Sequence, residues 1–335
     1  MSGPNDNVAG VDYIKANGDG STTTIGGVAG KLLQHNFNIN ALRTQDVLRK
    51  DEWIKFDERV IEVATQRLTA VQDLTSRGLT YSIPNALGIT RVEWETVSDM
   101  MDADISMSGL TVTPNDRVTF TQHAVPLPIV HKDFFINLRT LESSRRMGAS
   151  LDTMQVDRSA RIVSEKIESL LFNGSNMVGT SFTIPGYRTH DDRNTGSTTA
   201  DWNTATGDQI VGDILRMIGA AVGDHMYGPY MLYASTAAGV HMGDDYKSNS
   251  DKTIIQRVKE IPGILDVKFT EYLGNNEALL VQMTSDVVDM IDGIQPQTVM
   301  WESHGGFLIN FKVLAIMVPR IKSDDTGQSG IVHFT

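Results

Sequence analysis

Hydrophobic and polar positions define two long helical segments in this chain, with extended segments between and after them. The stronger pattern covers residues 151–173, where apolar residues recur every three or four positions and therefore share one stripe of a helix. The residues of this stripe are Val156, Ala160, Val163, Ile167, Leu170 and Leu171. Because Asn173-Gly174 is a typical helix end, we predict one long amphipathic helix over 151–173.

A second helical pattern covers residues 44–77 and stops at Gly78. Its apolar residues are Trp53, Phe56, Val60, Val63, Ala64, Leu68 and Val71. Residues 79–124 have no helical period and instead show alternating, β-branched runs separated by polar turns, which predicts a long, mostly exposed β-hairpin. Because a two-stranded ribbon is only marginally stable by itself, we expect this hairpin to lie on a neighbouring subunit.

The remaining segments alternate between strand and helix patterns. Residues 125–135 are apolar and extended, and their prolines restrict them to a sheet edge or to strand starts. Further helices are predicted over 141–147, 209–222 and 253–259, and further strands over 230–234, 263–269, 278–283, 286–291 and 298–301. The last apolar run, 305–321, contains Pro319 and is therefore predicted as a bent strand rather than a helix. Residues 174–207 are polar and are predicted as loops.

Residues 1–43 are rich in Gly, Asn, Ser and Thr and cannot bury enough apolar surface to fold alone. They form either a disordered tail or an arm that becomes ordered against a neighbouring subunit. In the second alternative, a few apolar residues would provide docking contacts, namely Leu32, Leu33, Phe37, Ile39 and Leu42.

Composition narrows the class of protein. The chain has 335 residues, long enough for a sizeable core, and no cysteine, which excludes disulfides and thiolate chemistry. No 18-residue apolar run is present, and the N-terminus does not have the pattern of a secretory signal. A net charge of −12 disfavours general binding to nucleic acid, because such affinity comes largely from Lys and Arg that neutralise phosphates.

Motifs with catalytic chemistry are absent from the sequence. It contains no phosphate-binding loop, no HExxH motif and no nucleophile elbow, and its eight histidines lack the spacing of metal ligands. Three acid pairs have the sequence context of turns: Asp191-Asp192, Asp244-Asp245 and Asp324-Asp325. We interpret them as solvated loops rather than as cation sites. We therefore predict no catalytic, cofactor or metal site, and no enzyme activity.

The order of elements resembles the HK97-type shell protein family, which comprises the major capsid proteins of tailed phages and the encapsulins. The resemblance covers about residues 45–322. Its most specific pieces are WIKFDERVIEVATQRL (53–68), VPLPIVHKDFFINLRTLESSRRMG (125–148), ARIVSEKIESLLFNGS (160–175) and GPYMLYAS (228–235).

This resemblance implies an α+β protein with the HK97-like capsid fold. Its expected parts are an N-terminal arm (1–43), an N-terminal helix (44–78), an extended β-hairpin or E-loop (79–124), a peripheral domain (125–189) with a long spine helix (151–173), an axial α/β domain (190–286), return strands of the peripheral domain (287–311), and a final axial strand with the C-terminal tail (312–335).

The resemblance further implies a structural protein that self-assembles into the icosahedral head of a phage around double-stranded DNA. Pentamers and hexamers of this chain, a portal protein and a separate scaffolding protein are the expected partners in the virion, and the question of a decoration protein stays open. Sequence-specific DNA contacts, a membrane partner, a cofactor and a covalent cross-link are not expected. Two alternatives remain, an encapsulin-like compartment shell and an unrelated soluble α/β enzyme. The long arm and long hairpin favour the phage capsid.

Six residues are candidate contacts between subunits. Trp94, Met100 and Met101 belong to the predicted hairpin, and Phe37 belongs to the arm. Arg145 and Arg146 follow the short helix, where they form a solvated face unless a partner presents acidic residues.

Overall fold

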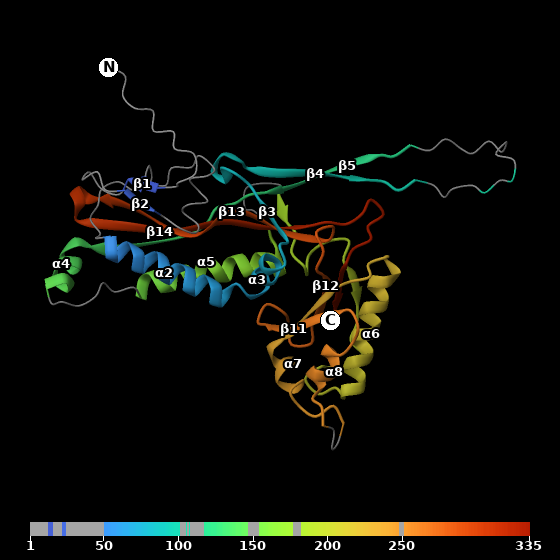
Figure 1. Ribbon diagram of the computed structural model, residues 1–335. Helices are drawn as coiled ribbons and strands as arrows, with labels where there is room; N and C mark the ends of the chain where they lie inside the picture. Colours follow the sequence, from blue (N-terminus) through green and yellow to red (C-terminus); the bar gives the residue numbers. More distant parts are fainter. Residues whose placement is uncertain are drawn as a thin grey trace.

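The computed structural model describes residues 50–100, 105, 107, 117–146, 154–176, 182–247 and 251–335, and the backbone of two short strands, β1 (Tyr13–Lys15) and β2 (Thr22–Thr24). Figure 1 shows three described parts: a long sheet with helices along one face, a narrow hairpin that projects past this body, and a lobe that contains the C-terminus. No helix within the described ranges is long and apolar enough to cross a membrane.

A four-stranded sheet with the order β3-β13-β14-β6 forms the centre of the elongated body. Its strands are β3 (Thr80–Ser82), β6 (Val130–Asn137), β13 (Val288–Ser303) and β14 (Leu308–Ile321). β13 and β14 are antiparallel neighbours joined through the short 3-10 helix η3 (His304–Gly306). β6 follows the proline-containing segment and lies at the sheet edge, as its sequence predicts.

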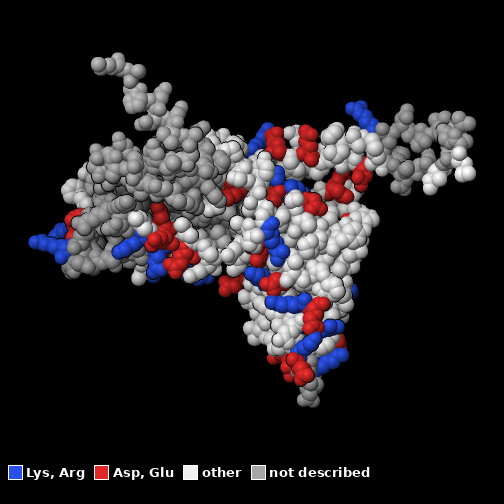
Figure 2. Space-filling model, viewed as in Figure 1, with Lys and Arg blue, Asp and Glu red and all other residues white. Residues whose placement is uncertain are grey.

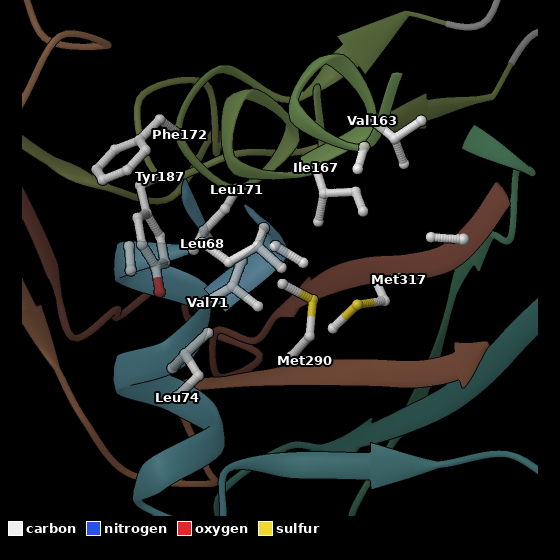
Figure 3. Close-up of a cluster of buried hydrophobic side chains, with 14 of the residues drawn as sticks. Leu68, Val71, Leu74, Val163, Ile167, Leu171, Phe172, Tyr187, Met290 and Met317 are labelled. Carbon is white, nitrogen blue, oxygen red and sulfur yellow. The ribbon is translucent and has the colours of Figure 1, made fainter. Parts of the chain in front are cut away.

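One face of this sheet is covered by helices α2 (Lys50–Arg67), α3 (Thr69–Ser76) and α5 (Met154–Asn173), with α4 (Leu138–Arg146) at one end (Figure 1). The helix predicted over 151–173 is confirmed as α5 over the described residues. In the close-up of Figure 3, side chains from helices and sheet meet in one cluster, including Leu68, Val71, Leu74, Val163, Ile167, Leu171, Met290 and Met317. Fully burying a side chain of this size contributes about 1.5–3 kcal/mol, so this cluster dominates the stability of the body.

The single helix predicted over 44–78 is wrong in one respect, because the chain breaks at Leu68 into α2 and α3. Glu168 of α5 lies at this break. Its carboxylate accepts the Ala70 N–H at 2.6 Å, the Val71 N–H at 3.3 Å and the Thr69 hydroxyl at 2.9 Å. A carboxylate favours the positive end of a helix, so α3 is capped by a residue almost a hundred positions away. Burial raises the pKa of Glu168, and these three hydrogen bonds partly offset that shift.

The lobe is built on a five-stranded sheet with the order β11-β10-β12-β15-β9. Its strands are β9 (Asn194–Gly196), β10 (Tyr230–Ser235), β11 (Ile264–Thr270), β12 (Ala278–Gln282) and β15 (Ile331–Phe334). Helices α6 (Gly207–Gly223), α7 (Thr236–His241) and α8 (Ile254–Lys259) form its helical layer. Every residue of β10 is buried, since alternate side chains join the core of the lobe and the core of the elongated body.

Two other expectations about the strands are corrected by the structure. The hairpin predicted from residue 79 begins only at Arg91, because Thr80–Ser82 pair with β13 and a 3-10 helix, η2 (Ala86–Gly88), follows. The strands predicted at 286–291 and 298–301 form one strand, β13, whose register shifts between Asp292 and Gln297. Such shifts bend a strand without ending it.

The assignment of residues 312–322 to the axial domain is also wrong. β14 stays hydrogen-bonded to β13 from Leu308 to Ile321, so this whole run belongs to the four-stranded sheet. The five-stranded sheet of the lobe, which corresponds to the expected axial domain and is called the axial sheet below, is instead completed by β15. This strand comes from the predicted C-terminal tail and pairs with β12 and β9. The apolar sequences of β14 and β15 each suit a buried strand. Only the pairing with distant strands shows which sheet each of them joins.

The chain turns sharply after α5 and packs back against the helix end. After two short strands, β7 (Ser175–Asn176) and β8 (Thr183–Ile184), the N–H groups of Tyr187 and Arg188 donate to the carbonyls of Leu171 and Phe172, both at 2.9 Å. Gly174 has φ +62°, and a Cβ there would lie 2.2 Å from the Ile184 carbonyl oxygen. Glycine is therefore required at position 174 both by the backbone conformation and by the close approach of a second chain segment.

We predict that Gly174→Ala destabilises the subunit far more than Gly78→Ala. Gly78 also has positive φ, but a Cβ there meets no atom within 4 Å. The control should therefore lose only the cost of left-handed backbone, about 1–2 kcal/mol, while Gly174→Ala adds a backbone clash and should lose roughly 3 kcal/mol or more. Urea unfolding of both variants measures the difference, and equal losses would refute the steric argument.

Candidate assembly surfaces

The hairpin consists of β4 (Arg91–Val97) and β5 (Phe120–Pro126), which are antiparallel with Trp94 opposite His123. Alternation places Trp94, His123 and Thr121 on one face of the ribbon. At its base, Val92 and Val125 are buried in a core cluster shared with the four-stranded sheet. The ribbon is therefore anchored at one end and projects past the body (Figure 1).

Aromatic and ionic contacts hold the inner face of the hairpin on its own subunit. The Arg320 guanidinium lies 4.5 Å from the Tyr81 ring centroid and 5.8 Å from that of Trp94. It also donates two hydrogen bonds to Asp289, at 2.8 and 2.5 Å, within a buried ion pair. Farther along, the Thr121 hydroxyl donates to Asp325 at 2.8 Å. These contacts are directional, so they set the angle at which the hairpin leaves the body.

Beyond these contacts the hairpin exposes large apolar side chains. Phe120 is 64% exposed and Met100 is 63% exposed, and Ile105 and Met107 are fully exposed. Acidic side chains accompany them, namely Glu93, Glu95 and Asp99, and Figure 2 shows acidic groups along the ribbon. An exposed apolar concentration of this kind marks an interaction surface in a soluble protein.

A second apolar surface lies at the end of the four-stranded sheet, on the face away from the helices. Strand register places Phe135, Asn310 and Trp301 side by side across three strands. Phe135 is 61% exposed, and the nearby Phe307 is 66% exposed. Trp301 is half-buried and has the Lys312 ammonium 5.6 Å from its ring centroid. We refer to Phe135, Trp301 and Phe307 as the aromatic end of the sheet.

A basic surface lies at the same end of the molecule, on α4. Arg139 and Arg146 are exposed there, and Arg145 lies in the same helix. Figure 2 shows basic groups at the end of the body where α4 lies in Figure 1. This surface is separated by the length of the sheet from the acidic hairpin of the same chain.

The six residues predicted as contacts therefore lie in different places. Trp94 packs against its own subunit, Met100 is exposed on the hairpin, and Arg146 is exposed on α4. Phe37, Met101 and the side chain of Arg145 lie outside the described residues. The aromatic end was missed, although the adjacent Phe134 and Phe135 in an extended segment indicate one phenylalanine on each face of a strand.

Within the described residues, no three His, Asp or Glu side chains gather closely enough to hold a metal. A groove between α2, α3 and β13 is lined by apolar and uncharged polar side chains, namely Ile61, Ala64, Thr65, Leu68, Val71, Gln72, Thr75, Gln295, Pro296 and Met317. The buried Asp213 has a structural role. Burial would raise its pKa, but hydrogen bonds from Thr199, Trp202 and Arg216 hold the pKa below its usual value.

The sequence of this chain matches one family model and one shell protein. The model of a family of unknown function (DUF6260) matches residues 40–334. The type 1 encapsulin shell protein EncA of Myxococcus xanthus (strain DK1622) is 25% identical over 137 residues, which are 40% of this chain and 45% of that protein. The match thus spans less than half the length of that relative.

Two solved structures resemble most of this chain. The virus-like particle from Pyrococcus furiosus has a TM-score of 0.59 at 14% identity, and the match covers 84% of this chain and 99% of that one. The capsid of Myoviridae phage XM1 has a TM-score of 0.61 at 12% identity, covering 78% and 91%. The predicted HK97-like fold is therefore confirmed.

We predict that Trp94→Ala loosens the hairpin without unfolding the body. The substitution removes the contact with Arg320 and the stacking on His123, whose ring centroid lies 5.7 Å away. Together these contribute about 1–2 kcal/mol, so amide hydrogens of β4 and β5 should exchange roughly tenfold faster. Glu95→Ala, on the opposite face of β4, is the matched control and should leave exchange unchanged when both variants are measured as dissociated subunits. Equal exchange in both variants would contradict the proposed attachment.

Proposed function

Since the chain belongs to the DUF6260 family of unknown function and has the fold of capsid and shell subunits, we propose that it is a structural protein that self-assembles into the icosahedral head of a phage. The observation that carries this proposal is the projecting hairpin, whose exposed apolar residues have nothing to bury them in the described part of their own chain. In a monomer such a ribbon is a liability, whereas in a shell it is a contact.

The aromatic end of a second copy is the surface that suits this hairpin. Both surfaces are apolar and exposed, and they lie at opposite ends of one subunit. A contact between different surfaces of identical subunits is heterologous and closes into a ring when the rotation permits. Pentamers and hexamers are such rings, and a stable contact of this kind buries about 800 Å² on each partner.

Charge is complementary in the same arrangement. The acidic hairpin would approach the basic surface of α4 on the next copy, which brings Glu95 and Asp99 towards the helix end that contains Arg145 and Arg146. Rim charges of this kind contribute modestly to affinity but select the correct register and speed association. The predicted role of Arg145 and Arg146 thus becomes part of the proposal, as does that of Met100 and Met101.

The contents and partners of the shell extend the proposal. A subunit with a net charge of −12 suits a container for double-stranded DNA that must not bind its inner wall tightly. As a phage head protein it would assemble in the bacterial cytoplasm, together with a portal protein and a separate scaffolding protein. We propose no enzyme activity for it. An encapsulin-like compartment is the second candidate, favoured by the likeness to EncA. Packaged DNA supports the first and a protein cargo supports the second.

The first experiment compares the full chain with a variant whose hairpin tip, residues 98–119, is replaced by Asn-Gly. Val97 and Phe120 are paired, and Asn-Gly is the preferred two-residue turn between paired strands, so the subunit should still fold. Sedimentation and electron microscopy should show shells or capsomers for the full chain and only small species for the variant. A full chain that stays monomeric or dimeric at high concentration would overturn the proposal.

A charge exchange tests the register. Glu95→Lys with Asp99→Lys should reduce the assembled fraction at least tenfold at low salt, because like charges then meet across the contact. Arg145→Glu with Arg146→Glu should do the same, and mixing the two variants should restore assembly. If mixing restores nothing while each variant remains folded by circular dichroism, the hairpin does not approach α4.

A further inference from the structure

Two buried histidines lie where the three parts of the subunit meet. His333 is 6% exposed and lies in β15 of the axial sheet, and His190 is 8% exposed in the segment that leads from the end of α5 to β9. Within the described residues, neither His333 Nε2 nor His190 Nδ1 has a hydrogen-bond partner. Buried polar atoms are nearly always paired, so this pair of histidines calls for an explanation.

His333 has charged neighbours from two adjoining strands. It lies opposite Leu279 of β12 and Thr195 of β9, and Glu277 and Arg193 immediately precede those strands and act on its ring. The Glu277 carboxylate is 3.9 Å from His333 Nε2, too far for a hydrogen bond. Glu277 instead accepts from Arg188 at 2.7 Å and from the Gly274 N–H at 2.8 Å. Its charge is therefore already matched by Arg188.

Arg188 makes this site part of the connection between the two cores. Its guanidinium donates to Asn173 at the end of α5 at 2.7 Å and to the Tyr272 carbonyl at 3.1 Å, besides Glu277. The Nε atoms of Arg188 and Arg193 are also buried without a hydrogen-bond partner among the described residues. His333 thus faces two guanidinium groups and one carboxylate that is already paired.

His190 connects the same segment to the base of the hairpin. Its backbone carbonyl accepts from Arg193 Nη1 at 2.7 Å. The charged and titratable groups around its ring are Asp191, Asp192 and Arg193 on its own segment and His123 on β5. Asp192 is partly engaged, because it accepts a hydrogen bond from Ser323 at 2.5 Å.

The surroundings of both imidazoles disfavour their protonated forms. Burial lowers the pKa of His190, and Arg193 and His123 lower it further, while Asp192 and Asp191 oppose the shift. Burial also lowers the pKa of His333, as do Arg193 and Arg188, while Glu277 opposes the shift. The unfolded chain then binds protons more readily than the folded one, so stability is lost as pH falls through the usual histidine value of about 6.5.

We propose that His190 and His333 form an acid-sensitive latch, in which protonation places new positive charge beside Arg188 and Arg193 and loosens segment 186–193 from β15, the hairpin base and the end of α5. Acidification then frees the axial lobe and the hairpin to change their angles to the body. Glu168 cannot produce the same effect, because the pKa of that buried carboxyl is raised. Its protonation relieves the cost of burying a charge and therefore acts in the opposite direction.

Hydrogen exchange of the full chain at pH 7.5 and 5.5, corrected for intrinsic rates, tests the latch in whatever assembly state the protein adopts. In the wild type, protection of 186–196 and of β15 should fall at least tenfold at pH 5.5, while β13 and β14 change little. His190→Gln with His333→Gln should abolish most of this difference. The matched control is His131→Gln with His304→Gln, since both histidines are exposed, and it should behave as the wild type does.

Three results would overturn the proposal. One is unchanged protection of 186–196 and β15 in the wild type at pH 5.5, and another is an equal loss in the double variant. If the double variant does not fold, His190→Gln and His333→Gln are measured singly, and each should remove part of the difference. Loss of protection spread evenly over both sheets would point to general acid unfolding and would also contradict the latch.

Discussion

The apolar stripe of α5, packed against β13 and β14, is the contact on which the rest of the subunit depends. Val156, Ile167 and Leu171 are completely buried in it, and each contributes about 1.5–3 kcal/mol. The same helix caps α3 through Glu168 and ends where the chain turns at Gly174. Through Arg188 its last turn also holds the axial sheet. One helix thus positions a second helix, a sheet and a lobe.

The hairpin is attached by contacts of another kind. Only its base is inserted in an apolar core, and its inner face is held by Arg320, Trp94 and Thr121. Apolar contacts are non-directional, whereas a guanidinium that lies near two aromatic rings and is paired with Asp289 has one preferred geometry. Removing one partner of such a buried ion pair is strongly destabilising, while the pair itself adds little net stability. Its contribution is therefore the direction of the hairpin, which is the property that a shell subunit needs.

Much of the fold could be predicted because its signals are local. The stripe of α5, the buried strand β10 and the edge strand β6 all follow from residues close together in the sequence. The break at Leu68 could not be predicted, since the group that caps α3 is Glu168, almost a hundred residues away. The candidate surfaces were predicted less well. The alternation in β4 assigns Trp94 and Glu95 to opposite faces, but it does not say which face meets the body, and Trp94 meets it.

The sequence by itself determined the type and order of most elements, because periods of 3.6 and 2 residues are properties of single segments. The sequence also contains no phosphate-binding loop, no HExxH motif and no nucleophile elbow. Only the tertiary structure decided that β14 pairs with β13 while β15 completes the axial sheet. Both segments are apolar, and the strand that each pairs with depends on hydrogen bonds between residues far apart in the sequence. The tertiary structure alone also brought His190 and His333 to one junction, because their neighbours come from separate strands and from segments more than a hundred residues apart.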